Sequence, residues 1–367
     1  MKRLFDGVPA DAEAEERAWA VVREAYAQRE PAARRRRSPV RPALVLAAAG
    51  AAAVAAALSP PGRAVVSAVG RSIGIENAEP ALFRLPSPGR LLVSGAGGTW
   101  VVSTDGSTRR LGAYAQASWS PHGLYVVAAT RDELVAVEPS TGKVHWQIAR
   151  AAIGFPRWGG TRADTRIAYV STSRLHVVAG DGTGDRRLAP SKRVAPAWQP
   201  GTSEHVLAYV DVRGRLTILE PDHGVVSRMS EPYAGVRDIA WSPSGRTIAL
   251  AARDEVVLFT VSTGRAHVLP VAGVRTLSFA RDGRLAMVRG DGVLLLDRGR
   301  VRTLFAAPSR LDGVAWSPDG RWLLTGLPQA DQWVFVQTRG ARRVLAVSHI
   351  RRQFGGEPVL DGWAPAA

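Results

Sequence analysis

The sequence contains no cysteine among its 367 residues. This excludes disulfide bonds, thiolate metal sites and a cysteine nucleophile. Lysine is nearly absent too, since only Lys2, Lys143 and Lys192 are present, and the net charge of +16 therefore comes almost entirely from arginine. Such a charge can indicate nucleic acid, an anionic membrane or an acidic wall polymer as a partner. Because the repeats carry it without a dense patch, an arginine-rich composition explains it at least as well.

Long uncharged runs are also scarce, but one run is long enough to bear on membrane insertion. No charged residue occurs from Pro42 to Gly62, a stretch of 21 residues that is long enough to cross a bilayer as a helix. Five arginines lie just before this stretch, whereas only Arg63 and Arg71 follow it closely. The preceding arginines are Arg34, Arg35, Arg36, Arg37 and Arg41. The positive-inside rule then predicts a single-pass protein of the cell membrane, with a cytoplasmic N-terminus and the remainder outside.

Three alternatives to this uncleaved anchor at 42–62 stay open. Ala55-Ala56-Ala57 resembles a signal-peptide cleavage site, but the segment before the apolar core is too long for one. The four consecutive arginines could bind RNA, although their position against an apolar run favours a role in topology. The alanine-rich run could also be a buried helix of a soluble protein. We favour the anchor.

The segments on both sides of the predicted anchor read as helical. Residues 1–41 form a predicted cytoplasmic segment with a short amphipathic helix at 11–30, which Asp11 caps and Pro31 ends. A narrow apolar stripe on this helix could bind a cytoplasmic regulator, or the helix could simply be solvated. Residues 63–80 are a predicted juxtamembrane amphipathic linker, whose short helix ends at Gly74 and could lie on the outer leaflet or pack under the rest of the protein.

A short motif recurs through the rest of the chain. An aromatic residue ends one strand, Ser-Pro-x-Gly reverses the chain, and an apolar strand follows. Proline fixes φ at the first central position of such a turn, and glycine accepts the positive φ that ends it. The full copies are Trp119-Ser120-Pro121-His122-Gly123, Trp241-Ser242-Pro243-Ser244-Gly245 and Trp316-Ser317-Pro318-Asp319-Gly320. Weaker copies begin at Trp158, Trp198 and Phe279, the last ending at Gly283, and Leu85-Pro86-Ser87-Pro88-Gly89 looks like a copy without its aromatic.

The spacing of these copies predicts the fold. From positions 85, 119, 158, 198, 241, 279 and 316, the successive spacings are 34, 39, 40, 43, 38 and 37 residues. A period near forty with several short strands is typical of a β-propeller. We therefore predict an all-β propeller at 81–346 with about seven four-stranded blades, six or eight being possible. The recurring tryptophans should fill the gaps between blades. The tail at 347–367 could supply a strand that closes the ring against the first blade.

The Trp-Ser-Pro-x-Gly unit resembles the WD40-like repeats of the TolB-type β-propeller family (PD40-type repeats). The resemblance covers roughly residues 81–346 and is strongest at Trp119, Trp241 and Trp316. It implies a six- or seven-bladed propeller that is often exported and binds proteins or peptides. The whole arrangement also resembles actinobacterial single-pass membrane proteins with an outer propeller. The Gly-His and Trp-Asp hallmarks of WD40 repeats are absent, so we expect that relation to be one of fold only.

The residues suggest no enzyme chemistry to us. Glu138 to Trp146 is similar to the repeat of quinone-dependent propellers, but a single copy is better explained by a hairpin with a Thr-Gly turn. The seven histidines show no metal-ligand spacing, and no G-x-S-x-G motif accompanies them. We expect a membrane-anchored, extracytoplasmic scaffold without catalysis, cofactor, metal or nucleic acid, which binds a protein, a peptide or a cell-envelope ligand. The alternative is a transmembrane sensor whose N-terminal helix holds a regulator in an anti-sigma-like manner; a quinoprotein or hydrolase is the weaker alternative.

Overall fold

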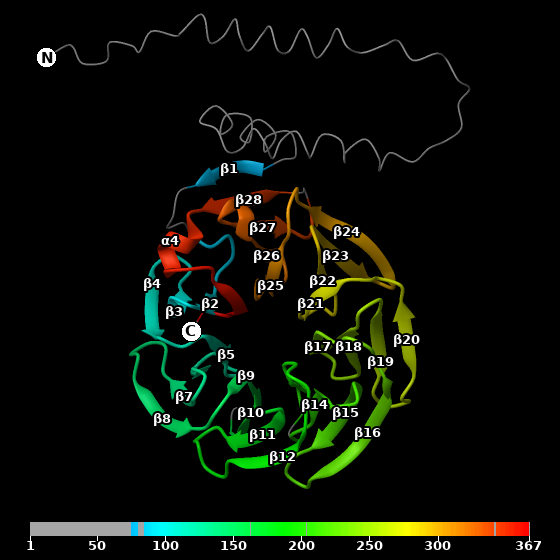
Figure 1. Ribbon diagram of the computed structural model, residues 1–367. Helices are drawn as coiled ribbons and strands as arrows, with labels where there is room; N and C mark the ends of the chain where they lie inside the picture. Colours follow the sequence, from blue (N-terminus) through cyan, green and yellow to red (C-terminus); the bar gives the residue numbers. More distant parts are fainter. Residues whose placement is uncertain (1–74, 80–83, 162, 203, 341–342, 367) are drawn as a thin grey trace, which may run out of the picture. The chain divides into compact units, whose positions relative to one another are not determined.

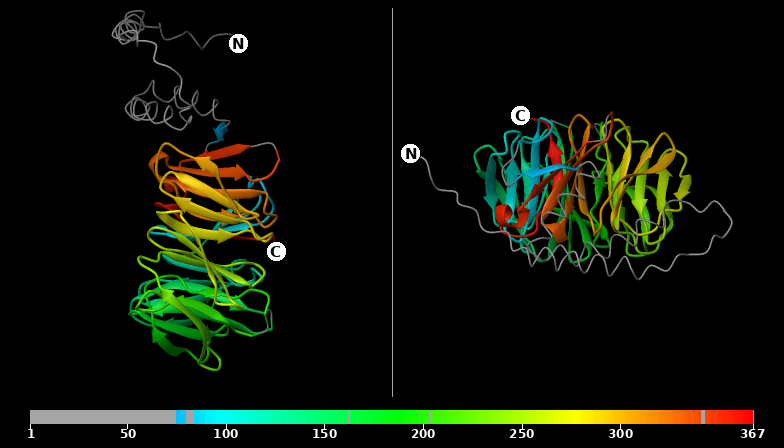
Figure 2. Two further views of the ribbon diagram at one scale, coloured as in Figure 1. Left: turned by 90° about the vertical axis from the view of Figure 1, so that its right-hand side faces the viewer. Right: turned by 90° about the horizontal axis from the view of Figure 1, so that it is seen from above.

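The computed structural model describes residues 75–79, 84–161, 163–202, 204–340 and 343–366. In this part of the chain, seven β-sheets surround a central axis (Figure 1), and Figure 2 shows the same ring turned by 90° about two axes. The predicted all-β propeller with seven blades is confirmed. The predicted helix at 11–30, the predicted anchor at 42–62, the arginines Arg34, Arg35, Arg36, Arg37 and Arg41, and most of the linker at 63–80 lie outside the described residues. None of the described helices has the length and apolar character required to span a bilayer.

Five blades consist of four consecutive strands each, which step outward from the axis as an antiparallel meander. We number the blades in chain order from the one that contains β2. Blade 2 holds β5 (Gln116–Trp119), β6 (Val126–Ala129), β7 (Glu133–Val137) and β8 (Val144–Ala149). Blade 3 holds β9 (Ile153–Gly160), β10 (Thr165–Ser171), β11 (Arg174–Ala179) and β12 (Arg186–Pro190). Blade 4 holds β13 (Ala197–Trp198), β14 (Leu207–Val210), β15 (Arg215–Glu220) and β16 (Val225–Pro232).

The remaining two of these regular blades continue the same pattern, and blade 7 adds a strand to it. Blade 5 holds β17 (Asp238–Trp241), β18 (Thr247–Ala251), β19 (Val256–Thr260) and β20 (Ala266–Leu269). Blade 6 holds β21 (Val274–Phe279), β22 (Leu285–Arg289), β23 (Gly292–Asp297) and β24 (Arg300–Ala306). Blade 7 holds β25 (Asp312–Trp316), β26 (Trp322–Leu327), β27 (Gln332–Gln337) and β28 (Val344–Ser348), with the short helix η1 (Pro328–Ala330) between β26 and β27.

Blade 7 has a fifth strand on its outer edge, and that strand comes from the region expected to be a linker. Strand β1 (Ile75–Glu79) pairs in parallel with β28. Pairing satisfies backbone groups that an outermost strand otherwise leaves exposed. Residues 75–79 of the expected linker thus belong to the propeller. Strand β28 also continues to Ser348, two residues past the boundary expected at 346.

Blade 1 closes the ring with strands from both ends of the propeller. Its order is β29 (Val359–Ala364), β2 (Arg90–Gly95), β3 (Gly98–Val102) and β4 (Thr108–Gly112). Strand β29 follows the short helix α4 (Ile350–Phe354) in the tail, and it pairs antiparallel with β2 as the innermost strand of the blade (Figure 1). Because the first and last strands share one sheet, opening the ring requires breaking their ladder.

The second and third strands of the blades are buried on both faces. Every residue of β6 is buried, and β7 is buried from Leu134 to Val137. This explains their nearly continuous apolar sequences, because stacked blades cover both faces of each sheet. The outermost strands differ, as β8 shows with several exposed side chains.

Seven hydrophobic clusters lie between adjacent blades in the described part of the chain, one at each junction. Each cluster contains an aromatic residue near the end of the inner strand of the later blade. These residues are Trp119, Trp158, Trp198, Trp241, Phe279 and Trp316 in blades 2 to 7, and Trp363 in blade 1. Their rings therefore occupy the positions that the widening gap between radiating sheets leaves to be filled.

Trp363 supplies the aromatic that the first copy of the motif lacks. Leu85 packs in the same cluster as Trp363, and the backbone of Gly89 lies against the Trp363 indole. The motif of blade 1 is therefore divided between the two ends of the propeller, with the aromatic on β29 and the glycine before β2.

We predict that Trp363→Ala lowers the free energy of unfolding by about 3–5 kcal/mol, because it leaves a cavity at the junction that closes the ring. Trp363 is 8% exposed. The measurement is the urea midpoint of the full-length protein, followed by tryptophan fluorescence. Val359→Ala is the matched control, since Val359 lies on the same strand but is 53% exposed. Equal midpoints for the two variants would show that the tail strand does not stabilise the ring.

Candidate ligand-binding site

The two faces of the ring carry different connections. Successive strands of a meander run in opposite directions, so the turn after each inner strand lies on one face. We call this the turn face, because it carries the Ser-Pro-x-Gly turns. The opposite face carries the connections between blades and the loops between second and third strands. We call it the pocket face.

The three complete turns have nearly identical geometry. The serine carbonyl accepts a hydrogen bond from the glycine N–H three residues later, at 2.8–2.9 Å. The glycines have φ of +67°, +67° and +66°. The serine hydroxyl, which the sequence analysis did not single out, accepts from the backbone N–H five residues later, at 2.9–3.1 Å. The turns are those with Pro121 and Gly123, Pro243 and Gly245, and Pro318 and Gly320; in the weaker copy Gly283 has φ of +86°.

A long side chain from the preceding blade binds each of these three turns. Arg90 donates to the Gly123 carbonyl at 2.7 Å, Gln199 to the Gly245 carbonyl at 2.8 Å, and Arg284 to the Gly320 carbonyl at 2.6 Å. The guanidinium groups of Arg90 and Arg284 also lie over the rings of Trp119 and Trp316, about 5 Å from their centroids. These contacts stabilise adjacent blades against one another. The repeated residues of the turn face therefore have structural partners.

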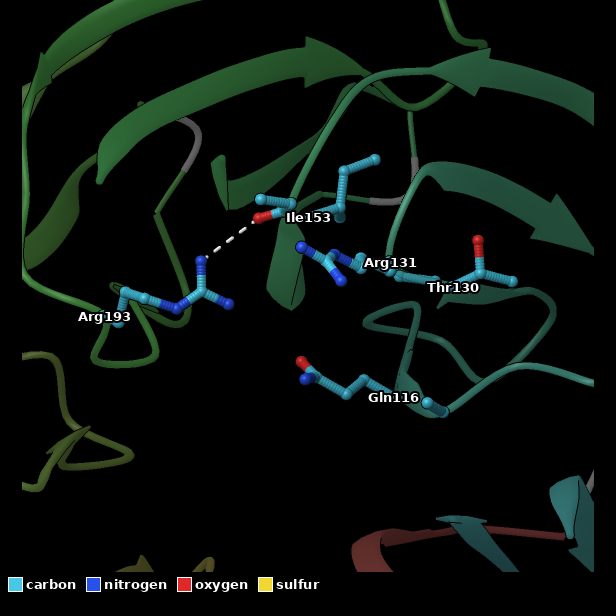
Figure 3. Close-up of a pocket in the computed structure, with 8 residues that line it drawn as sticks. Gln116, Thr130, Arg131, Ile153 and Arg193 are labelled. Atoms are coloured by element: carbon cyan, nitrogen blue, oxygen red, sulfur yellow. Dashed lines mark hydrogen bonds between the residues drawn. The ribbon is translucent and has the colours of Figure 1, made fainter. Parts of the chain in front are cut away.

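The pocket face has a cavity of about 380 Å³ between blades 2 and 3 (Figure 3). Its walls are mostly apolar carbon from four residues, Ala115, Ala129, Ala152 and Ile153. The polar side chains come from three connections: Gln116 begins β5, Thr130 and Arg131 lie between β6 and β7, and Arg193 lies between β12 and β13. In Figure 3 the side chains of Gln116, Arg131 and Arg193 converge on the same space.

Two residues beside this cavity have unusual backbone conformations. Ala152 has φ of +55° and Phe155 has φ of +59°, which are uncommon for residues with a side chain. The Phe155 N–H donates to the Gln116 Oε1 atom, and the Ala152 carbonyl accepts from Arg193 Nη1 at 3.1 Å. Strained backbone of this kind is found at binding sites, where the surrounding structure holds it in place.

The inner strands carry a group of charged residues nearer the axis. The positive charge of Arg157 on β9 acts at a distance to lower the pKa values of Asp238 on β17 and Asp361 on β29, although neither strand is paired with β9. Asp238 accepts from the N–H groups of Leu277 and Ile239, at 2.7 and 2.9 Å. Asp361 lies where the pairing of β29 with β2 shifts register, and its Oδ2 atom is buried without a hydrogen-bond partner among the described residues.

Burial governs the ionisation of these two carboxyl groups. It raises the pKa of Asp238 to about 6, against the smaller opposing effects of its two backbone donors and Arg157. It raises the pKa of Asp361 to about 7, where Ser94, Arg157 and the Ala117 N–H oppose it. Burial penalises the charged form, so both carboxylates are less stable in the folded protein than in water.

A second cavity, of about 360 Å³, lies on the turn face between blades 6 and 7. Its polar groups are already paired with one another. Asp282 binds Arg284 through Nε at 3.0 Å and Arg339 through Nη2 at 2.8 Å. The charges that line it thus largely neutralise each other, which makes it a weaker candidate for a ligand site. Across the described residues, no three His, Asp or Glu side chains are grouped as a metal ion would require.

We predict that Asp361→Asn stabilises the protein by about 4 kcal/mol at pH 8 and by about 1.5 kcal/mol at pH 5, and that it has little effect below about pH 4. A pKa raised in the folded state means that the folded protein binds more protons than the unfolded chain between about pH 4 and 7. Stability from this group is therefore present at low pH and is lost as the pH rises through 7. Urea midpoints of both proteins across this range test it, with the exposed Asp254→Asn as control. A pH-independent difference would contradict the assignment.

Comparison with known proteins supports the fold. Residues 299–336 match the family model of the WD domain, G-beta repeat, so the relation to WD40 repeats includes sequence in this stretch as well as fold. No curated protein matches the chain. The β-propeller domain of Cps50 (Swd1) from Myceliophteria thermophila is similar, with TM-score 0.53 and 12% identity over 66% of this chain and 92% of that one. A chain of a mitotic checkpoint complex is also similar, with TM-score 0.53 and 16% identity over 69% and 88%. The chain is a seven-bladed β-propeller that contains a WD40-type repeat.

Proposed function

We propose that this protein is a membrane-anchored, extracytoplasmic scaffold that binds a protein or peptide without catalysing a reaction. WD40-type propellers in general bind proteins, and the observation that carries the proposal is the cavity on the pocket face. Its side chains converge from three separate connections of a rigid ring, as the variable loops of a binding scaffold do. The turn face is the weaker candidate, because its repeated glycine carbonyls are bound by Arg90, Gln199 and Arg284.

The anchor part of the proposal rests on the sequence. The uncharged run at 42–62 and the five arginines at Arg34, Arg35, Arg36, Arg37 and Arg41 support a cytoplasmic N-terminus and an outer propeller. Nucleic acid is then not an expected partner, and the arginine-rich surface would meet the cell envelope.

Reporter fusions after Arg41 and at the C-terminus test the anchor, together with membrane fractionation. We expect the fusion after Arg41 to report a cytoplasmic position and the C-terminal fusion an outer one, on an uncleaved, membrane-bound chain. A chain found in the soluble cytoplasmic fraction would refute the anchor, and it would make nucleic acid a partner to test.

Site-specific photo-crosslinking in cells tests which face binds. A photoreactive amino acid replaces Val212 or Asp254, which are exposed in pocket-face loops, or Ser140 and Ser244, which are exposed on the turn face. We expect discrete crosslinked products from the pocket-face positions and none from the turn face. The reverse pattern would show that the turns, and not the cavity, form the binding surface.

A further inference from the structure

We propose that the cavity between blades 2 and 3 is a carboxylate-binding site that receives an acidic side chain or the free C-terminus of a peptide. This inference rests on the proposed scaffold function and specifies its ligand. The site would be formed by Gln116, Arg131 and Arg193, with an apolar wall for the residues next to the carboxylate.

Arg193 is held in position before any ligand arrives. Its Nη1 atom donates to the Ala152 carbonyl at 3.1 Å, and its guanidinium lies over the Phe155 ring at 5.5 Å. A side chain on Gly154 would meet Nη2 at 2.9 Å, so the close approach depends on glycine there. The remaining N–H groups of the guanidinium are available to a ligand. Fixing a donor in advance reduces the entropy lost on binding.

Gln116 is oriented by the same backbone. Its Oε1 atom accepts the Phe155 N–H, which leaves its amide NH₂ group as a donor. The positive φ of Phe155 therefore has a consequence at the site, because it directs that N–H toward Gln116. The strained backbone of Ala152 and Phe155 therefore orients two of the three donors, Arg193 and Gln116.

Arg131 supplies the third donor and has freedom to adjust. Within the described residues its guanidinium makes no hydrogen bond or ion pair, and the side chain is exposed. None of the eight residues that line the cavity is acidic, and all eight are described. The two positive charges are thus not neutralised within the cavity. An anion can form a charge-assisted hydrogen bond with each of them.

The shape and lining favour a carboxylate over a phosphate. The planar guanidinium fork can bind two oxygens of either group, so the lining decides: the mostly apolar walls offer few donors for the additional oxygens of a phosphate. Those walls suit the aliphatic part of a glutamate side chain or the last side chain of a peptide. The volume of about 380 Å³ is at the lower end for ligand pockets. A cavity of this size can hold a few residues of a peptide, but not the surface of a folded protein.

Fluorescence anisotropy with defined peptides tests the site, using the full-length protein in a non-ionic detergent. Three labelled peptides of one sequence are compared: an internal Glu with an amidated C-terminus, an internal Gln with an amidated C-terminus, and the Gln peptide with a free C-terminus. We expect the Glu peptide, the free-carboxylate peptide or both to bind about tenfold or more tightly than the amidated Gln peptide. Which one binds identifies the source of the carboxylate.

Variants locate the binding. Arg131→Ala combined with Arg193→Ala should abolish the preference for a carboxylate, and Arg193→Lys should reduce it because the charge remains without the fork. Arg237→Ala is the matched control: Arg237 is exposed on the same face but does not line the cavity. It should leave the preference unchanged. An unchanged urea midpoint shows that each variant is folded.

Several results would overturn the proposal. These are equal affinity for all three peptides, an equal loss in the Arg237→Ala variant, or stronger competition by inorganic phosphate or a single-stranded oligonucleotide than by acetate. None of them would bear on membrane topology or on the face that crosslinks. Conversely, a cytoplasmic propeller would refute the anchor and leave the binding of these peptides unaffected.

Discussion

The packing of one aromatic side chain into each blade junction is the interaction on which the ring depends. At three junctions the indole N–H also donates, at 2.9 Å, to the carbonyl of the residue just before the aromatic of the preceding blade: Trp198 to Arg157, Trp241 to Ala197, and Trp316 to Ser278. The same side chain thus fills the gap between two sheets and fixes the position of one inner strand along the propeller axis relative to the next. Phe279 keeps the packing without the hydrogen bond.

Closure of the ring follows from the same rule. A junction without its aromatic would leave a gap, and the copy at Leu85 has none. Trp363 fills that junction from the other end of the propeller, on a strand that also covers the open inner edge of β2. One segment therefore meets two requirements at once, because it completes a hydrophobic cluster and pairs an exposed strand edge.

The repeat could be predicted from sequence because its signal is local. Proline and glycine set the turn, and the aromatic sits one residue before it, so that the period of about forty residues is visible without any long-range information. Trp363 was missed as a repeat member because Ala364 and Pro365 preserve only part of the motif and its glycine precedes β2. The cavity could not be predicted at all. Gln116 and Arg131 lie close together because β5 pairs with β6 in blade 2, but Arg193 comes from the connection between blades 3 and 4, and only the arrangement of blades in the ring brings it to the other two.

In the proposed site, the residues that would bind a ligand are not those that hold adjacent blades together. On the turn face, the glycine carbonyls of the three complete motifs accept hydrogen bonds from the preceding blade, so a ligand at these carbonyls would have to displace contacts that hold the ring together. On the pocket face, Arg131 and the amide NH₂ of Gln116 retain donors that no blade uses within the described part of the chain. Substitutions there would change the ligand specificity of the proposed site with little effect on the stability of the blade junctions. The positive φ values of Ala152 and Phe155 lie on this side as well, where strain can be supported by the rigid strands around it.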